Sequence, residues 1–213
     1  MDILKKQFAS KLLQIKAIKL QPNNPFTWAS GWKSPFYCDN RKTLSYPDLR
    51  SYVKLELTHA ILEHFPQAEA VAGVATGAIA QGALVADALS LPFVYVRSKP
   101  KDHGLENLIE GELKPGTKVV VVEDLISTGG SAIECVEALR EAGAEVLGIV
   151  SIFTYGMKKG LERLEAAHTQ NHSLCNLDVL VEVAAGEGRI APEWKARILA
   201  FRDNPSDETW IQK

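Results

Sequence analysis

The chain has 213 residues, of which 46% are hydrophobic and 23% charged, as is usual for a folded globular protein. Its formal net charge of -2 removes the main electrostatic argument for nucleic-acid binding, which needs a basic surface. The three cysteines (Cys38, Cys135 and Cys175) are odd in number and widely spaced, which fits reduced thiols in the cytoplasm better than disulfides. Lysines interrupt the apolar residues of positions 1–20, so we expect neither a signal peptide nor a membrane span.

Helical and extended patterns alternate along the chain, with polar loops between them. Apolar residues at helical spacing predict helices over 3–15, from about 48 through 61, and over 77–89, 133–139, 156–167 and 192–201. Apolar runs predict strands over 68–74, 93–96, 119–122, 146–153 and 177–183, while 21–35 and 97–115 are expected to be loops. This alternation indicates an α/β fold around a mainly parallel sheet, with the ligand beyond the carboxyl ends of the strands.

The run Val-Val-Val-Val-Glu-Asp-Leu-Ile-Ser-Thr-Gly-Gly-Ser, from Val119 to Ser131, carries the most information. A β-branched strand that reads as buried on both faces ends in two carboxylates, Glu123 and Asp124. The Ser/Thr/Gly turn that follows offers backbone N–H groups at a helix start, where a phosphate dianion binds well. Carboxylates would repel a phosphate, so these two must face another part of the same ligand. The hydroxyl groups of a sugar phosphate are such a part.

This run closely resembles the signature of type I phosphoribosyltransferases, which bind 5-phosphoribosyl-1-pyrophosphate (PRPP). The resemblance implies that Glu123 and Asp124 face the ribose hydroxyls and take part in catalysis. It also implies that the PRPP site includes the residues that follow, which are Leu125, Ile126, Ser127, Thr128, Gly129, Gly130 and Ser131. The last five of these, residues 127–131, would hold the 5-phosphate. A plain glycine turn, with acids that only cap or solvate, is the alternative.

A second candidate site lies in the segment Val-Arg-Ser-Lys-Pro-Lys-Asp-His-Gly. Arg97, Lys99, Lys101 and His103 occupy alternate positions. If the segment is extended, as Pro100 favours, all four side chains project from one face. Such a row suits a polyanion such as pyrophosphate, and the long glycine-flanked stretch is typical of an active-site lid. A solvated charged loop is equally compatible with the spacing.

The same segment looks like the mobile catalytic loop of orotate phosphoribosyltransferases, members of that superfamily. In this family the loop closes over PRPP bound in the partner subunit of a homodimer. The resemblance implies that Arg97, Lys101 and His103 meet the pyrophosphate, with Lys101 and His103 catalytic. Many members carry a lysine where this chain has Ser98, so Lys99 would supply that charge.

The stretch Ser-Gly-Trp-Lys-Ser-Pro-Phe-Tyr resembles the element that forms the hood over the base in this family. Phe36 and Tyr37 could stack on a planar pyrimidine, and Lys33 could attract its carboxylate. The resemblance adds Ser127 to the orotate-binding residues. These aromatic side chains could instead belong to the core. An arginine with which some members read the base falls near Tyr155.

The turn Gly-Val-Ala-Thr-Gly falls where the family binds pyrophosphate, which adds Thr76 and Gly77 to the expected PRPP site. The implied fold is a single type I phosphoribosyltransferase domain over 1–213, with a central mainly parallel sheet flanked by helices and a small hood from 1–40. The pattern of His168, His172 and Cys175 lacks a cysteine pair or an intervening glutamate and is a weak candidate for a metal site.

The implied activity is transfer of phosphoribose from PRPP to orotate, giving orotidine 5′-monophosphate and pyrophosphate. Magnesium would be held mainly by substrate and water rather than by protein ligands. The expected protein is a cytoplasmic homodimer with shared active sites that binds neither nucleic acid nor membrane. Two alternatives remain: a purine phosphoribosyltransferase, which the Lys-Asp-His-Gly loop disfavours, and a PRPP-sensing regulator that binds RNA or DNA, which the charge balance disfavours.

Overall fold

The computed structural model describes residues 3–28, 30–98 and 108–211. At its centre a six-stranded sheet has the order β10-β9-β8-β5-β6-β7. All neighbouring pairs are parallel except β6 and β7, which are antiparallel. The strands are β5 (Ala70–Val74), β6 (Phe93–Val96), β7 (Ile109–Glu110), β8 (Lys118–Ile126), β9 (Glu145–Thr154) and β10 (Asn171–Asn176). The predicted mainly parallel sheet is confirmed.

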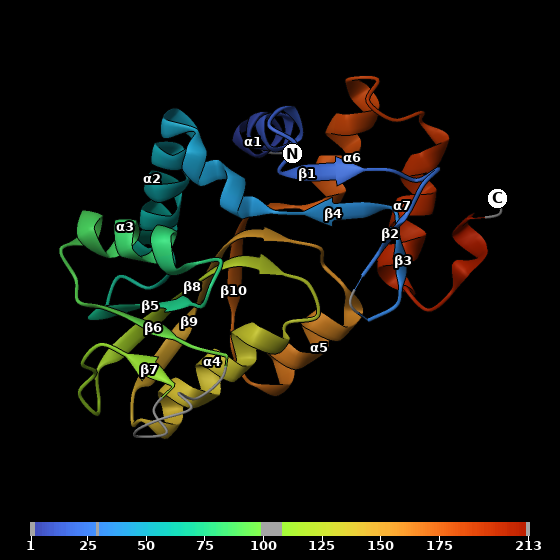
Figure 1. The fold of residues 1–213 in the computed structure, drawn as a ribbon. Coiled ribbons are helices and arrows are strands. Elements are labelled where there is room, and N and C mark those ends of the chain that lie inside the picture. The colour runs from blue at the N-terminus through green and yellow to red at the C-terminus, as the bar shows by residue number, and fades with distance from the viewer. Residues whose placement is uncertain (1–2, 29, 99–107, 212–213) are drawn as a thin grey trace.

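Helices cover both faces of this sheet (Figure 1). On one face lie α2 (Pro47–His64) and α3 (Ile79–Leu89), and on the other lie α4 (Gly130–Glu141) and α5 (Lys158–Ala166). The four valines of β8, at positions 119–122, are fully buried between these layers. Because β8 is central and covered on both faces, its sequence is continuously apolar rather than alternating.

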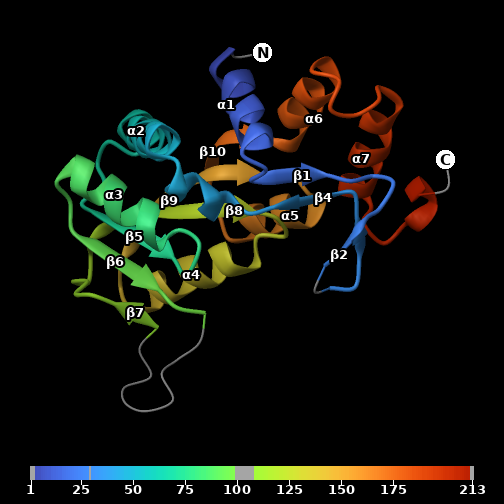
Figure 2. The same cartoon turned by 45° about the horizontal axis from the view of Figure 1, so that its top comes forward.

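The N-terminal part adds two small antiparallel strand pairs. The first joins β1 (Ile18–Leu20) to β4 (Phe36–Cys38), and the second joins β2 (Phe26–Thr27) to β3 (Lys33–Ser34). The first pair lies beside α1 (Ile3–Gln14), as Figure 2 shows. A short 3₁₀ helix, η1 (Asn40–Ser45), then leads into α2.

The C-terminal part packs against these elements. It consists of α6 (Leu177–Gly186), α7 (Glu193–Asp203) and the short η2 (Glu208–Ile211). Helix α1 contacts α6, and α6 in turn contacts α7. Among the helices in the described ranges, none is long and apolar enough to cross a membrane.

One predicted element is wrong. The apolar run 177–183 was expected to be a strand but forms most of α6. The helix starts there because the Asn176 side chain accepts a hydrogen bond from the Val179 N–H at 3.0 Å, which is a typical N-cap, and because Asp178 favours the first turn. The strand in this region is instead the preceding polar segment, β10, at the edge of the sheet.

The two predicted loops each contain short strands. Strands β2 and β3 lie within 21–35, and β7 lies within 97–115. These strands are two residues long, so they have no periodicity that a sequence pattern could show. The other predicted helices and strands are confirmed, with ends that differ by a few residues.

Candidate active site

Two turns lie side by side at the carboxyl edge of the sheet, because β5 and β8 are adjacent and parallel. The turn after β8 spans 127–129 and leads directly into α4. Gly129 has a φ of 74°, a left-handed conformation that glycine adopts without a steric penalty. The first N–H groups of α4 lack partners within the helix, so the turn and helix start together form the expected anion-binding arrangement. We call residues 127–131 the phosphate turn.

The Asp124 carboxylate connects the phosphate turn to the turn after β5. A β-carbon added to Gly77 would overlap all three atoms of this carboxyl group, so the carboxylate lies directly against the Gly77 backbone. Asp124 is partly exposed. The structure therefore brings together the two segments that the sequence assigned to the PRPP site, with a carboxylate between them.

Glu123 lies in a different environment from its neighbour. Its side chain is buried, with its Oε1 accepting the Asp124 N–H at 2.8 Å and its Oε2 accepting the Ser131 hydroxyl at 3.4 Å. Burial raises the pKa of Glu123 well above its usual range, and the negative charge of Asp124 raises it further. The sequence pattern does not distinguish the two acids. In the structure the Glu123 side chain is buried and accepts a backbone N–H, whereas Asp124 is partly exposed.

Of the four cationic residues of the second candidate site, only Arg97 lies within the described residues. Arg97 follows β6 and is partly buried, with its N–H donating to the Leu108 carbonyl at 2.9 Å. Its guanidinium lies 3.5 Å from the carboxylate of Glu110 on β7. Lys99, Lys101 and His103 lie outside the described residues, so the predicted row of cations stays a prediction.

Phe36 is placed differently from the expectation that it stacks on a base. Its side chain is fully buried and packs against Trp28, Tyr155 and Phe201, with ring centroids 4.6 to 5.7 Å away. A ring enclosed in this way has no free face for a planar ligand. Tyr37 alternates with it along β4 and is 42% exposed, so Tyr37 is the aromatic residue of the pair that a base could reach.

The residues around this aromatic cluster show how the N-terminal strands sit on the sheet. Tyr155, just after β9, stacks with Trp28 at 5.5 Å and is buried, which raises its pKa. Asn40 is also buried and donates a hydrogen bond of 2.6 Å to the Asp124 carbonyl. Lys33 is exposed and donates to the Thr27 hydroxyl at 2.7 Å. The strand pairs are thus fixed over the carboxyl ends of β8 and β9.

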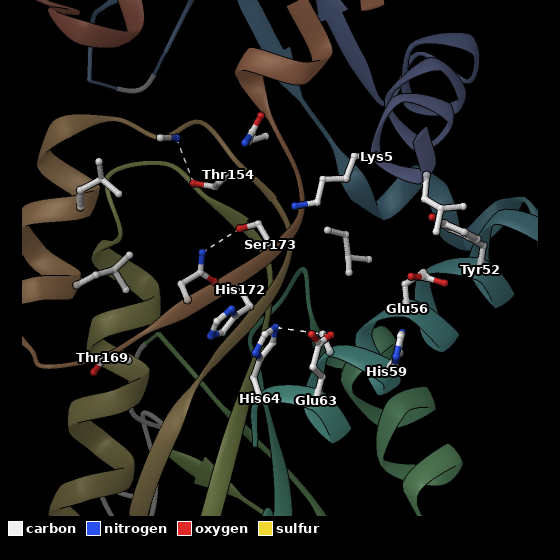
Figure 3. Close-up of a pocket in the computed structure, with 18 residues that line it drawn as sticks. Lys5, Tyr52, Glu56, His59, Glu63, His64, Thr154, Thr169, His172 and Ser173 are labelled. Carbon is white, nitrogen blue, oxygen red and sulfur yellow. Dashed lines mark hydrogen bonds and ion pairs between the residues drawn. The ribbon is translucent and has the colours of Figure 1, made fainter. Parts of the chain in front are cut away.

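A separate cavity of about 760 Å³ runs along the edge strand β10, between α1 and α2 on one side and α5 on the other (Figure 3). There His172 stacks on His64 with ring centroids 3.6 Å apart. Burial lowers the pKa of His172, and the nearby His64 lowers it further. His172 and Cys175 point to different partners, since the Cys175 thiol donates to the Lys5 carbonyl at 3.7 Å. Within the described part of the chain, no group of three or more potential ligands could hold a metal ion.

Sequence reasoning missed the support of the phosphate turn by α5. Arg163 donates to the Thr128 carbonyl at 3.0 Å, and Gly160 lies against the Ser127 carbonyl. Neither residue belongs to a recognisable motif, because both act from an element more than thirty positions further along the chain.

Comparisons with known proteins agree with this arrangement. The model of the phosphoribosyl transferase domain matches residues 56–172. Orotate phosphoribosyltransferases of Bacteroides thetaiotaomicron and Bacillus cereus are 63% and 58% identical to this chain, over 206 and 208 residues that cover at least 97% of each chain. The crystal structure of orotate phosphoribosyltransferase from Aeropyrum pernix has a TM-score of 0.74 at 28% identity, covering 86% of this chain and 99% of that chain. The chain therefore belongs to the phosphoribosyltransferase family, and within it to the orotate phosphoribosyltransferases.

Proposed function

We propose that this protein transfers phosphoribose from PRPP to orotate, forming orotidine 5′-monophosphate and pyrophosphate in pyrimidine biosynthesis. The observation that carries the proposal is the phosphate turn with the Asp124 carboxylate beside it, lying on Gly77 of the neighbouring turn. One ligand that bears a 5-phosphate, a ribose and a second anionic group would meet all three parts. The near full-length relatives named above support orotate as the acceptor.

The chemistry follows from where charge develops. A ring nitrogen of orotate attacks C1 of the ribose as the pyrophosphate oxygen leaves, and positive charge develops on the ribose in the transition state. A carboxylate beside the sugar stabilises that charge, and Asp124, which is partly exposed where Glu123 is buried, is the acid that suits this role. By family resemblance, Arg97, Lys101 and His103 would stabilise the departing pyrophosphate, with Lys101 or His103 as a proton donor.

We also propose that the reaction depends on Mg²⁺. The partly exposed Asp124 carboxylate is a suitable ligand for a hard cation that keeps most of its contacts with substrate oxygens and water. The buried, pKa-raised Glu123 is a poor ligand for a hard cation. When bound, Mg²⁺ would neutralise charge on the pyrophosphate.

For the base, we propose a site between the phosphate turn and the N-terminal strand pairs, which would form the hood contributed by 1–40 to a single domain spanning 1–213. Ser127 borders this site, and Tyr37 supplies the accessible ring. Lys33 would pair with the orotate carboxylate after releasing the Thr27 hydroxyl. Tyr155, which replaces an arginine of some relatives, is buried and supports the hood rather than the base.

The decisive experiment follows the loss of orotate in the presence of PRPP, with and without Mg²⁺. Adenine, guanine and xanthine serve as competing acceptors, and turnover of a purine but not of orotate would replace this proposal with a purine phosphoribosyltransferase. A gel-shift assay with RNA and DNA, with and without PRPP, tests the alternative that the protein is a PRPP-sensing regulator that binds nucleic acid. Nucleic-acid binding without any transferase activity would favour that alternative.

We further propose a homodimer in which each cationic loop serves the partner's PRPP site. Lys101→Ala and Asp124→Asn should each lower activity on the order of a hundredfold. Co-refolding the two variants should restore about a quarter of wild-type activity, because random pairing gives about half heterodimers with one intact site each. A mixture that stays inactive while a tag pull-down shows heterodimers would place the loop in its own subunit.

A cytoplasmic location is our last proposal here, supported by three buried free cysteines.

A further inference from the structure

We propose that Arg163, assisted by Gly160, is a positioning residue that aims the N–H groups of the phosphate turn at the 5-phosphate. This inference rests on the proposed function, since it assumes that the turn binds the phosphate of PRPP. Both residues belong to α5, which packs against α4 behind the turn and is not itself part of the phosphate-binding segment.

The closest contacts are made to carbonyl groups, and the Arg163 Nη1 also donates to the Thr128 hydroxyl at 3.5 Å. Arg163 Nη1 donates to the Thr128 carbonyl at 3.0 Å. A β-carbon on Gly160 would lie 2.6 Å from the Ser127 carbonyl oxygen, so the absence of a side chain lets that carbonyl reach the helix. Two consecutive peptide groups of the turn therefore have their oxygens directed to α5.

The direction of the carbonyls determines the direction of the N–H groups. In a trans peptide the C=O and the N–H of the same plane point to opposite sides. When the oxygens of Ser127 and Thr128 point to α5, the N–H groups of Thr128 and Gly129 point away from it, towards the open side of the turn. Neither N–H has a hydrogen-bond partner among the described residues. Consecutive N–H groups held in this way form an anion-binding concavity.

Arg163 also places a positive charge behind the turn. Its Nη1 would be 3.1 Å from a β-carbon on Gly130, the first residue of α4, so the guanidinium lies next to the helix start. The charge adds to the positive end of the α4 dipole without touching the ligand. Arg163 thereby contributes both orientation and charge, and substitutions can separate the two.

A second arginine provides a matched control. Arg140 lies in the last turn of α4 and donates to the Ala167 carbonyl at 2.8 Å, just after α5. It joins the same pair of helices through the same kind of hydrogen bond, but far along α4 from the phosphate turn. Loss of Arg140 tests what helix packing alone contributes.

The experiment measures KM for PRPP and for orotate, and the Kd of ribose 5-phosphate, in the full-length protein. Arg163→Met should raise the KM for PRPP and the Kd of ribose 5-phosphate about tenfold, with the KM for orotate changed by less than about twofold. Arg163→Gln keeps a donor without charge and should lie between wild type and Arg163→Met. Arg163→Lys keeps the charge and should recover most of the affinity, while Arg140→Met should match wild type.

Gly160→Ala tests the same geometry without altering any charge, because its methyl group would push the Ser127 carbonyl away from α5. It should also weaken ribose 5-phosphate binding selectively, even if Arg163→Met proves unstable. The inference is overturned if both variants bind ribose 5-phosphate like wild type, or if the KM values for PRPP and orotate rise equally. A wild-type protein that consumes no orotate in the presence of PRPP would instead overturn the proposed function.

Discussion

Glu123→Gln and Asp124→Asn should have very different effects, although the two acids are adjacent and the substitutions are chemically equivalent. Glutamine keeps an oxygen that can accept the Asp124 N–H, and its amide can donate to the Ser131 hydroxyl, so the buried contacts of Glu123 survive. Asp124→Asn instead removes a negative charge beside the developing positive charge. We expect a loss of kcat on the order of a hundredfold for Asp124→Asn and of less than about threefold for Glu123→Gln.

The pH dependence of stability gives the same prediction an independent measurement. The folded-state pKa of Glu123 is raised, so the folded protein keeps a proton that the unfolded chain releases above a pKa of about 4.3. The stabilising contribution is complete below the unfolded pKa and is lost as pH rises through the folded pKa. Relative to wild type, Glu123→Gln should therefore gain stability progressively as pH rises through that window.

Steady-state kinetics with saturating PRPP and thermal unfolding from pH 4 upward would test both expectations on the same preparations. Equal losses of kcat in the two variants would refute the division of roles between the acids. A constant difference in Tm between Glu123→Gln and wild type across the pH range would contradict the raised pKa.

Three further predictions concern positions with defined contacts. Gly77→Ala should lower kcat about tenfold or more, because its methyl group displaces the Asp124 carboxylate, whereas Gly186→Ala, which meets no atom within 4 Å, should be neutral in the same assay. His172→Asn should flatten the acid limb of the Tm–pH curve: the lowered pKa means that wild type loses stability as pH falls below about 6.5, and parallel curves would contradict this. Asn40→Ala should lower the free energy of unfolding by about 1 kcal/mol in urea titrations, since it removes a part-buried hydrogen bond to the Asp124 carbonyl, and an unchanged value would show that this bond is dispensable.

The central strand and its turn could be predicted from sequence because the information there is local. Four consecutive valines indicate a strand buried on both faces, and the Ser/Thr/Gly turn before an amphipathic helix indicates an anion site. In this segment the structure differs from the prediction only in that β8 continues through both acids to Ile126. Family resemblance then supplied what the turn binds.

The errors have two physical origins, one in a local cap and one in side-chain packing. The apolar run in α6 is compatible with a strand or a buried helix, and the local Asn176 cap together with Asp178 favours the helix. Phe36 and Tyr37 have similar side chains, but the alternation of β4 and the packing of Trp28 bury one and expose the other. The role of Arg163 has no sequence signal, because it depends on how α5 docks against the phosphate turn.

The hydrogen bond from Asn40 to the Asp124 carbonyl has a consequence for protein engineering. It spans 84 positions and joins the end of the N-terminal strand pairs to the strand that carries the acids. A chimera that exchanges the segment over the base, to accept a different heterocycle, should therefore place its junction before Asn40, between β4 and η1. With the junction at this place, Asn40 stays in the same parent protein as the Asp124 carbonyl, so their hydrogen bond is kept. The grafted segment is then joined to a residue whose position is already fixed.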